Sequence, residues 1–271
     1  MMQAIEARPL ALADHAGGHG DAMILMHGGS GSHRHWDRVF APLARHFEVH
    51  APDLPGFGQS PDAPEPASGD AYVALAAASL ARLVPARRVH LVGFSFGGAV
   101  AAAVARAWGA RVHRLSLIAP GGFGPPEGRP HPTRSRKVTD SSDAALRAVA
   151  RHNLGVTMLA DVAAIDDATV DLQLWNLAHA RYDSHHVSYQ RRLLDDIARI
   201  AAPLQLIWGE HDVFARPSLQ ARAERVRAAR PDVRLDVVAG AGHWCQHECP
   251  DAVVRLLLDF HAPRGATPET A

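Results

Sequence analysis

The stretch Val89–Val100, VHLVGFSFGGAV, contains the motif that decides the fold of this chain. Apolar residues typical of a buried strand run directly into GFSFG at 93–97, and small residues that favour a helix follow. This is Gly-x-Ser-x-Gly between a strand and a helix, the context in which the motif presents a nucleophilic serine on a tight turn. The following helix begins at Ser95, so its dipole and free N–H groups face developing negative charge. A glycine-rich turn with an incidental serine is the alternative, and the rest of the chain decides between the two.

Length and composition restrict the class of protein. At 271 residues, with 47% hydrophobic and 21% charged residues, the chain fits one large α/β domain or one domain that carries an inserted subdomain. Its 28 basic residues balance 28 acidic ones, so no net charge favours nucleic acid or an anionic membrane. The N-terminal residues predict no signal peptide, and no apolar run has the length of a membrane span. We therefore expect a soluble cytoplasmic protein with a small-molecule substrate and neither nucleic acid nor a membrane as partner, with homo-oligomerisation left open.

The two cysteines, Cys245 and Cys249, are too few for a disulfide framework. A zinc site would need two further ligands, and His243 and His247 alternate with the cysteines, so such a site is an alternative. The other histidines are dispersed along the chain and form no metal-spaced cluster. We expect neither a metal nor an organic cofactor.

Strand-like and helix-like segments alternate along most of the chain. The expected strands are 22–27, 47–51, 88–94, 112–119, 204–208 and 234–238, and the expected helices are 36–45, 71–84, 97–108, 217–229 and 251–260. Strands and helices that alternate at this spacing predict a mostly parallel sheet with helices on both faces.

The alternation is interrupted between 120 and 199. Residues 120–132 contain four glycines and five prolines, which excludes a regular element, and 143–199 reads as several amphipathic helices without a strand. About sixty helical residues favour a cap inserted over the strand ends, because a crossover connection, the alternative, needs only one helix. We expect a core at 1–120 and 200–262, a helical cap at 121–199 and a disordered tail at 263–271.

Candidate functional residues follow the predicted strands. Ser95, Asp212, His243 and the loop at 27–29 each come after the carboxyl end of a strand. Ligands of open parallel sheets bind outside these strand ends, so the residues should converge at one edge. Their order along the chain, Ser then Asp then His, is the order that an α/β-hydrolase requires.

With these residues in this order, the chain resembles the α/β-hydrolase superfamily over nearly its whole length. The matching segments are HGGSG at 27–31, DLPGFGQS at 53–60, GFSFGG at 93–98, WGEHD at 208–212 and GAGHW at 240–244. The resemblance implies an α/β-hydrolase fold in which Ser95 is the nucleophile, His243 the general base and Asp212 the residue that orients the imidazole. It also implies an oxyanion hole made of the backbone N–H groups of Gly29 and Phe96.

Other residues compete for two of these roles. Glu210 precedes Asp212 by two positions, and alternation at the end of a strand does not separate the two carboxylates. The family pattern selects Asp212. His211 and His247 are rival bases, and the position of His247 at the start of the final helix favours a surface or supporting role.

Two segments resemble the carbon–carbon bond hydrolases of aromatic meta-cleavage pathways. They are APGGFGP at 119–125 and GHWCQHE at 242–248. In that family a tryptophan directly after the base lines the pocket, which implies the same for Trp244. Gly28, Phe94 and Trp175 complete the predicted substrate pocket, which should be largely apolar. Core packing explains Trp175 equally well and is the alternative for Trp244.

The chain departs from that family at two positions. Phe94 stands where those enzymes usually carry asparagine, and Leu174 stands where they carry an arginine that grips a dienoate carboxylate. Arg181 and Arg191 lie nearby and are candidates to replace it, with a solvated surface position as the favoured alternative for both. We therefore predict a serine hydrolase of a carboxylic ester or lactone, with carbon–carbon cleavage of a dienoate as the first alternative. A non-catalytic protein that binds a small ligand is the second.

Overall fold

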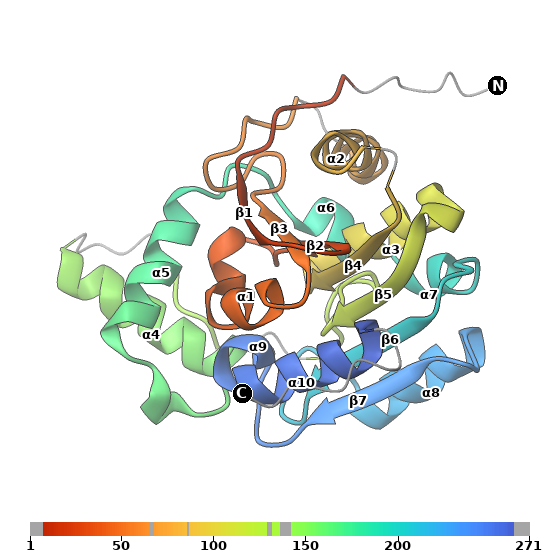
Figure 1. Cartoon of the computed structure of the whole chain (residues 1–271). Coiled ribbons are helices and arrows are strands. Elements are labelled where there is room, and N and C mark those ends of the chain that lie inside the picture. The colour runs from red at the N-terminus through yellow and green to blue at the C-terminus, as the bar shows by residue number, and fades with distance from the viewer. Residues whose placement is uncertain (1–7, 65–67, 86, 129–131, 136–141, 263–271) are drawn as a thin grey trace, which may run out of the picture.

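The computed structural model describes residues 8–64, 68–85, 87–128, 132–135 and 142–262, so the predicted tail at 263–271 lies outside the described residues. The described residues form a seven-stranded sheet in the order β1-β3-β2-β4-β5-β6-β7, with helices on both faces (Figure 1). The strands are β1 (Asp14–Gly18), β2 (Ala22–Met26), β3 (Glu48–Pro52), β4 (Val89–Phe94), β5 (Val112–Ile118), β6 (Leu204–Gly209) and β7 (Arg234–Val238).

The sheet is parallel except at one edge, where β1 pairs antiparallel with β3. The strands β2, β4 and β6 are buried at every position, as expected for parallel strands that are covered on both faces. The sequence did not predict β1, because DHAGG shows no apolar alternation, and in the structure three of its five residues are exposed and two are half-buried. Its backbone pairing with β3 makes it a strand.

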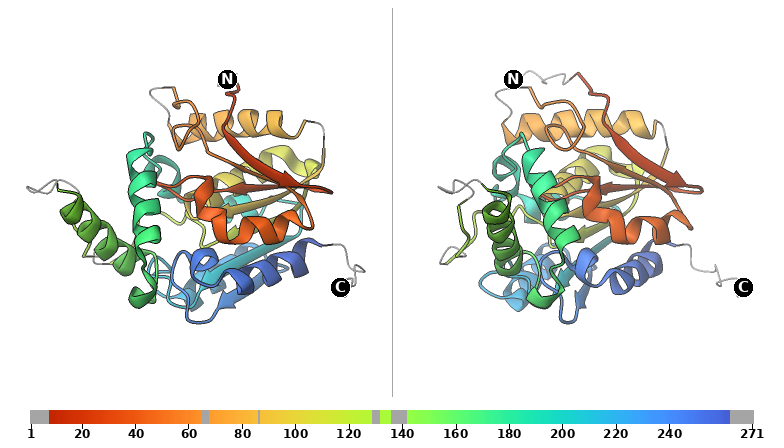
Figure 2. Two further views of the ribbon diagram at one scale, coloured as in Figure 1. Left: turned by 60° about the vertical axis from the view of Figure 1, so that its left-hand side comes forward. Right: turned by 90° about the vertical axis from the view of Figure 1, so that its left-hand side faces the viewer.

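Two layers of helices enclose the sheet. On one face α1 (Asp37–Ala44) packs against α10 (Pro250–His261), and α2 (Gly69–Leu83) lies on the opposite face (Figure 2). There α2 packs on α3 (Phe96–Trp108), α3 on α7 (Leu193–Ile197) and α7 on α8 (Leu219–Ala229). The hydroxyls of Ser68 and Ser218 accept hydrogen bonds from backbone N–H groups at the start of α2 and α8, which satisfies donors that a helix leaves free.

The described chain between β5 and β6 consists of helices and loops and contributes no strand to the sheet. It contains α4 (Asp143–Thr157), η3 (Val162–Ala164), α5 (Asp167–Ala178), α6 (His185–Ser188) and α7. In Figure 1, α4 and α5 lie beside the sheet, whereas α7 packs on α3 and α8 in the helical layer of the core. The division at 121 and 199 stays a prediction, because α6 and α7 both pack on helices of the core layer, α6 on α2 and α3 and α7 on α3 and α8. The remaining short helices are η1 (His33–Trp36), η2 (Gly109–Arg111) and α9 (Cys245–Glu248).

Candidate active site

Ser95 occupies the turn between β4 and α3 in a backbone conformation that residues with a side chain rarely adopt. Its φ is 53° and its ψ is −114°. The surrounding backbone holds this conformation: Ser95 N–H donates to Ile118 O at 2.9 Å, and Ser95 O accepts from Gly98 N at 3.0 Å and from Gly121 N at 2.8 Å. The turn therefore presents the serine side chain at the carboxyl end of the sheet.

Close packing of strands and helix explains the two glycines that flank the serine. A Cβ atom on Gly93 would lie 2.4 Å from Gly97 O, and one on Gly97 would lie 2.3 Å from the carbonyl oxygens of both Met26 and His27. Side chains at these two positions would force β2, β4 and α3 apart. The motif is thus a requirement of packing as well as of chemistry.

His243 lies between Ser95 and Asp212. Its Nε2 is 3.0 Å from Ser95 Oγ, and its Nδ1 is 2.9 Å from Asp212 Oδ1. When Nδ1–H of His243 donates a hydrogen bond to Asp212 Oδ1, Nε2 carries no proton and can accept the serine hydroxyl proton. The rings of Phe94 and Phe214 flank the imidazole, with centroids 5.1 and 4.6 Å away. The three side chains are positioned to move a proton from a hydroxyl to an imidazole.

The competing residues lie elsewhere. Glu210 Oε2 accepts from Gly240 N at 2.9 Å, and both Glu210 and His211 are exposed. His247 is buried, its ring stacks on Trp244 at 4.1 Å, and burial lowers its pKa to about 4. None of the three has a described hydrogen bond or ion pair with Ser95 or His243.

The loop after β2 brings Gly28 and Gly29 to the serine. The peptide groups on both sides of Gly28 are engaged, because Gly28 O accepts from His27 Nδ1 at 2.8 Å and Gly28 N donates to His35 Nδ1 at 3.2 Å. Gly28 N–H is therefore directed at a histidine. Gly29 and Phe96, the first residue of α3, line one cavity together with Ser95.

His27 joins this loop to the loop after β3. Its Nε2 accepts from Leu54 N at 2.9 Å while its Nδ1 donates to Gly28 O, so the neutral ring uses both nitrogens. Burial lowers the pKa of His27 to about 4, which keeps the ring neutral. The side chain is a fixed bridge between two loops at the edge of the site.

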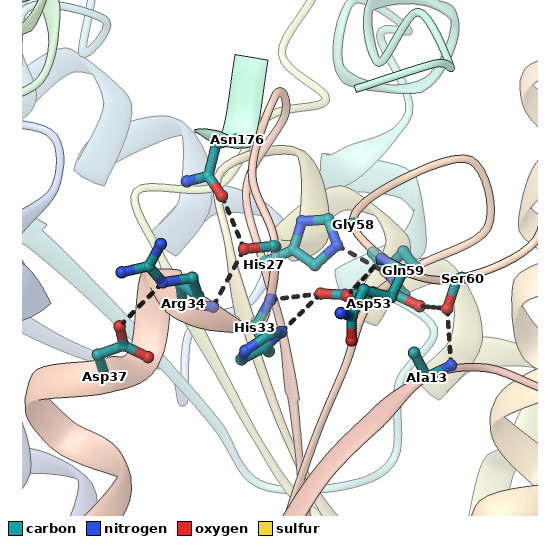
Figure 3. Close-up of polar contacts among 12 residues, drawn as sticks. Ala13, His27, His33, Arg34, Asp37, Asp53, Gly58, Gln59, Ser60 and Asn176 are labelled. Carbon is teal, nitrogen blue, oxygen red and sulfur yellow. Dashed lines mark hydrogen bonds and ion pairs between the residues drawn. The ribbon is translucent and has the colours of Figure 1, made fainter. Parts of the chain in front are cut away.

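Asp53 holds together the same two loops, those that follow β2 and β3. Its Oδ1 accepts from His33 N at 2.7 Å and from the His33 ring at 3.0 Å, and its Oδ2 accepts from Gln59 N at 2.8 Å (Figure 3). Ser60 Oγ donates to Asp53 O and accepts from Ala13 N at 2.9 Å. The DLPGFGQS segment is thus a structural support for the site.

A cavity of about 580 Å³ lies between the strand ends and the helical segment that follows β5. Seven of the predicted site residues line it, namely Gly28, Gly29, Phe94, Ser95, Phe96, Asp212 and His243. The helical segment contributes residues 180–185, Ser188 and Tyr189. This volume lies in the range of pockets that enclose small organic ligands.

The structure places the two predicted pocket tryptophans away from this cavity. Trp244 is fully buried and donates from Nε1 to His35 O at 3.2 Å, so its indole packs behind the loop. Trp175 stacks on His179, four residues further along, with ring centroids 4.0 Å apart. Neither lines the cavity, because the directions of these side chains depend on packing that the sequence pattern does not show.

Of the two arginines proposed from the sequence, one lines the cavity and one does not, and the cavity has a further arginine that was not predicted. Arg181 lines the cavity, whereas Arg191 is exposed and packs against Gly124. Arg222, on α8, lines the cavity and was not predicted. A signal for it exists: Arg222 and Val226 are the two buried residues of α8 and are spaced i,i+4 on one helix face.

No group of three or more histidine, cysteine or acidic side chains within the described ranges is placed to hold a metal ion. The thiol of Cys245 is buried, and burial raises its pKa well above its ordinary value. Among the same residues, no helix has both the length and the apolar character needed to cross a membrane.

A mostly parallel sheet with helices on both faces and a strained serine after β4 defines the α/β-hydrolase class. Residues 23–256 match the family model described as the alpha/beta hydrolase family, and the chain belongs to this family. It is 28% identical to a 2-hydroxy-6-oxo-6-phenylhexa-2,4-dienoate hydrolase of Burkholderia cepacia, over 90% of this chain and 89% of that protein.

Solved structures show similar backbones. One is a putative aryl esterase from Burkholderia cenocepacia, with a TM-score of 0.76 and 26% identity over 92% of this chain and 93% of that one. Another is a meta-cleavage product hydrolase from Pseudomonas fluorescens IP01, with a TM-score of 0.73 and 24% identity over 93% of this chain and 96% of that one. At that identity the second likeness concerns the fold.

Proposed function

We propose that this protein is a serine hydrolase in which Ser95 attacks the carbonyl carbon of a small substrate. The observation that carries the proposal is the pair of contacts of His243, 3.0 Å from Ser95 Oγ and 2.9 Å from Asp212 Oδ1. His243 takes the serine proton, and Asp212 keeps the ring oriented and stabilises the imidazolium that forms.

The reaction runs in two halves. Ser95 Oγ bonds to the carbonyl carbon, and the imidazolium of His243 returns its proton to the leaving group as that bond breaks. A water molecule then gives a proton to His243 and attacks the acyl-enzyme, and Ser95 recovers its hydroxyl proton when the acid is released. The sum is one water consumed for each carbonyl bond cleaved.

Backbone N–H groups of Gly29 and Phe96 form the oxyanion hole in this proposal. Phe96 N–H is at the start of α3, where helix N–H groups lack intrahelical acceptors. Gly28 N–H is engaged by His35, which leaves Gly29 as the donor from the loop. A donor of this kind lowers the barrier by about 3 kcal/mol.

The helical segment at 121–199 acts as the cap of the site. It lines the cavity together with the strand ends, and an isolated backbone bridge joins Ala180 to Phe57 on the loop after β3. A cap that excludes water strengthens the electrostatic interactions inside the cavity.

We propose a carboxylic ester or lactone as the substrate. Phenylalanine rings at 94, 96, 123 and 214 contribute apolar walls, and the similar backbone of a putative aryl esterase supports this choice. Carbon–carbon cleavage is the second candidate, favoured by the relative from Burkholderia cepacia whose name is that of a dienoate hydrolase. Phe94 weighs against it, because this fully buried ring replaces the amide expected beside the nucleophile.

A substrate panel and a serine-directed probe test the proposal. We expect turnover of 4-nitrophenyl esters, labelling of the wild-type protein by a fluorophosphonate and loss of both in Ser95→Ala. Strong turnover of meta-cleavage dienoates without esterase activity would replace the first candidate by the second. A folded wild-type protein that the fluorophosphonate leaves unlabelled would instead favour a ligand-binding role.

A further inference from the structure

Arg222 is a buried cation in the wall of the cavity. Its side chain extends from α8, the residue is 7% exposed, and it shares the cavity lining with Ser95. Two backbone carbonyls orient the guanidinium: Nε donates to Arg216 O at 2.8 Å and Nη2 donates to Phe214 O at 3.1 Å. The guanidinium lies over the Phe123 ring, with Cζ 4.0 Å from the ring centroid. The guanidinium is therefore held in one orientation.

No described carboxylate forms an ion pair or a hydrogen bond with this cation, and Nη1 donates to no described residue. Asp212 and Glu127 attract the guanidinium at longer range, and Arg225 repels it. Burial lowers the pKa of Arg222 to about 10, so the group still carries its charge at neutral pH. A buried charge without a direct ion pair is costly, and a guanidinium with unused donors is suited to a planar carboxylate.

Two other basic side chains of the wall differ from Arg222. The guanidinium of Arg181 pairs with Asp62 and also donates to backbone oxygens of the loop after β3. His185 Nδ1 lies 2.8 Å from Asp183 Oδ1. Both side chains already face a carboxylate, so of the two described arginines of the wall Arg222 is the one without a direct ion pair.

The order of the strands places Arg222 at a definite end of the site. β2, whose loop carries Gly29, lies on one side of β4, and β5 and β6 lie on the other. Phe123 follows β5, and the turn that binds Arg222 follows β6. Arg222 is thus on the side of Ser95 opposite the loop that carries Gly29.

We propose that Arg222 binds a carboxylate of the substrate, separate from the carbonyl that reacts at Ser95. The class of substrate is then a carbonyl compound with a second, ionised group, such as a monoester of a dicarboxylic acid. The guanidinium forms charge-assisted hydrogen bonds with that carboxylate, while Phe123 and Phe214 enclose the carbon chain between the two groups. This inference rests on the proposed function of Ser95 and names the substrate class of the same site.

Arg222 also has a structural contact that the experiment has to separate from binding. Phe214, whose carbonyl accepts from Arg222, donates its N–H to Asp212 Oδ1 at 2.9 Å. Loss of the arginine therefore disturbs the turn next to Asp212 and slows neutral and anionic substrates alike. A specific contact with a carboxylate changes the ratio between them.

The test compares each anionic ester with its methyl-capped neutral form. On the acyl side the pair is mono-4-nitrophenyl glutarate and its methyl ester; on the alcohol side it is 4-acetoxybenzoate and its methyl ester. We expect the wild type to favour the anion in at least one pair. In Arg222→Gln that preference in kcat/KM should fall about tenfold or more, and Arg222→Lys should keep part of it. Arg227→Gln removes an equal charge from an exposed position on α8 and should keep the wild-type ratio.

An unchanged ratio in both pairs for Arg222→Gln would overturn the proposal, as would an equal fall in Arg227→Gln. Binding of mono-4-nitrophenyl glutarate to Ser95→Ala, measured by titration calorimetry, gives a readout that needs no turnover. Addition of Arg222→Gln should weaken this binding about tenfold. If that binding is lost as expected but wild type cleaves no ester, the anion site stands and the proposed hydrolysis at Ser95 fails.

Discussion

Gly29 and Ser184 approach so closely that a Cβ atom on Gly29 would lie 2.4 Å from Ser184 Oγ. The first residue belongs to the loop after β2, and the second belongs to the helical segment between β5 and β6. The proposed oxyanion loop is therefore packed directly against the proposed cap. A change on either side of this contact should alter the position of the Gly29 N–H.

We expect Gly29→Ala to lower kcat about tenfold or more, because the new methyl group displaces the loop and with it an oxyanion donor. Gly29 has no positive φ, so the alanine itself is not strained. Ser184→Gly removes the opposing hydroxymethyl group. If the clash is the cause, the double variant Gly29→Ala, Ser184→Gly should recover most of the lost kcat in steady-state measurements. A double variant as slow as Gly29→Ala would contradict this explanation.

Replacement of Ser95 should separate activity from stability. Ser95→Ala should reduce esterase kcat by about four orders of magnitude, because neither half of the reaction has a nucleophile. His243→Ala should cost a similar factor, and the two losses should not add, since the side chains act as a unit. Equal turnover by wild type and Ser95→Ala would remove Ser95 from the mechanism.

The strained backbone of Ser95 predicts a stability effect of its own. Glycine adopts a φ of 53° without the steric cost that a Cβ atom brings. Ser95→Gly should therefore unfold with a free energy about 1 kcal/mol higher than that of Ser95→Ala, in denaturant titrations of the two inactive variants. Equal midpoints would show that the turn carries no such strain.

His27 should be a positioning residue for the oxyanion loop. Its removal in His27→Ala leaves Leu54 N–H and Gly28 O without their buried partner, which costs about 1–3 kcal/mol for each group. We expect kcat to fall more than KM changes, since the loop donor acts on the transition state. His33→Ala is the matched control: its ring is partly exposed, hydrogen-bonds to Asp53 and stacks on His15, so kcat should change less.

Buried neutral histidines predict that stability falls as the solution becomes acidic. Burial lowers the pKa values of His27, His90 and His247 to about 4, below the value of about 6.5 expected in the unfolded chain. Between these values the unfolded chain binds more protons than the folded one. The free energy of unfolding should thus decrease by about 1.4 kcal/mol per pH unit for each histidine as the pH falls from 6.5 toward 4.

His247→Gln tests this relationship through the pH dependence of unfolding. The variant should lose the contribution of one histidine to the slope between pH 6 and 4.5. Above pH 7 all three histidines are neutral in both states, so the slope there should match that of the wild type. A wild-type unfolding free energy that stays constant from pH 6.5 to 4.5 would contradict the assignment.

Local patterns along the chain predicted most of the core and the residues proposed here as nucleophile, base and acid. Buried parallel strands are near-continuous apolar runs, and the residues at their carboxyl ends share one edge of a sheet whatever the rest of the fold does. Ser95, Asp212 and His243 could therefore be expected at one edge from their positions, whereas the choice of Asp212 over Glu210 came from the family pattern. The sequence did not predict the edge strand β1, because β1 is defined by its backbone hydrogen bonds with β3 and not by a pattern of its own side chains.

Only the tertiary structure decided which side chains line the cavity. Trp175 and Trp244 have suitable chemistry, but they pack on His179 and behind His35, whereas Arg222 enters the wall from a helix remote from Ser95 in sequence. In a parallel sheet the chain direction of each strand fixes the edge at which the strand ends. The direction of a side chain from a helix or loop depends on contacts between segments far apart in the chain, and the sequence pattern does not contain those contacts.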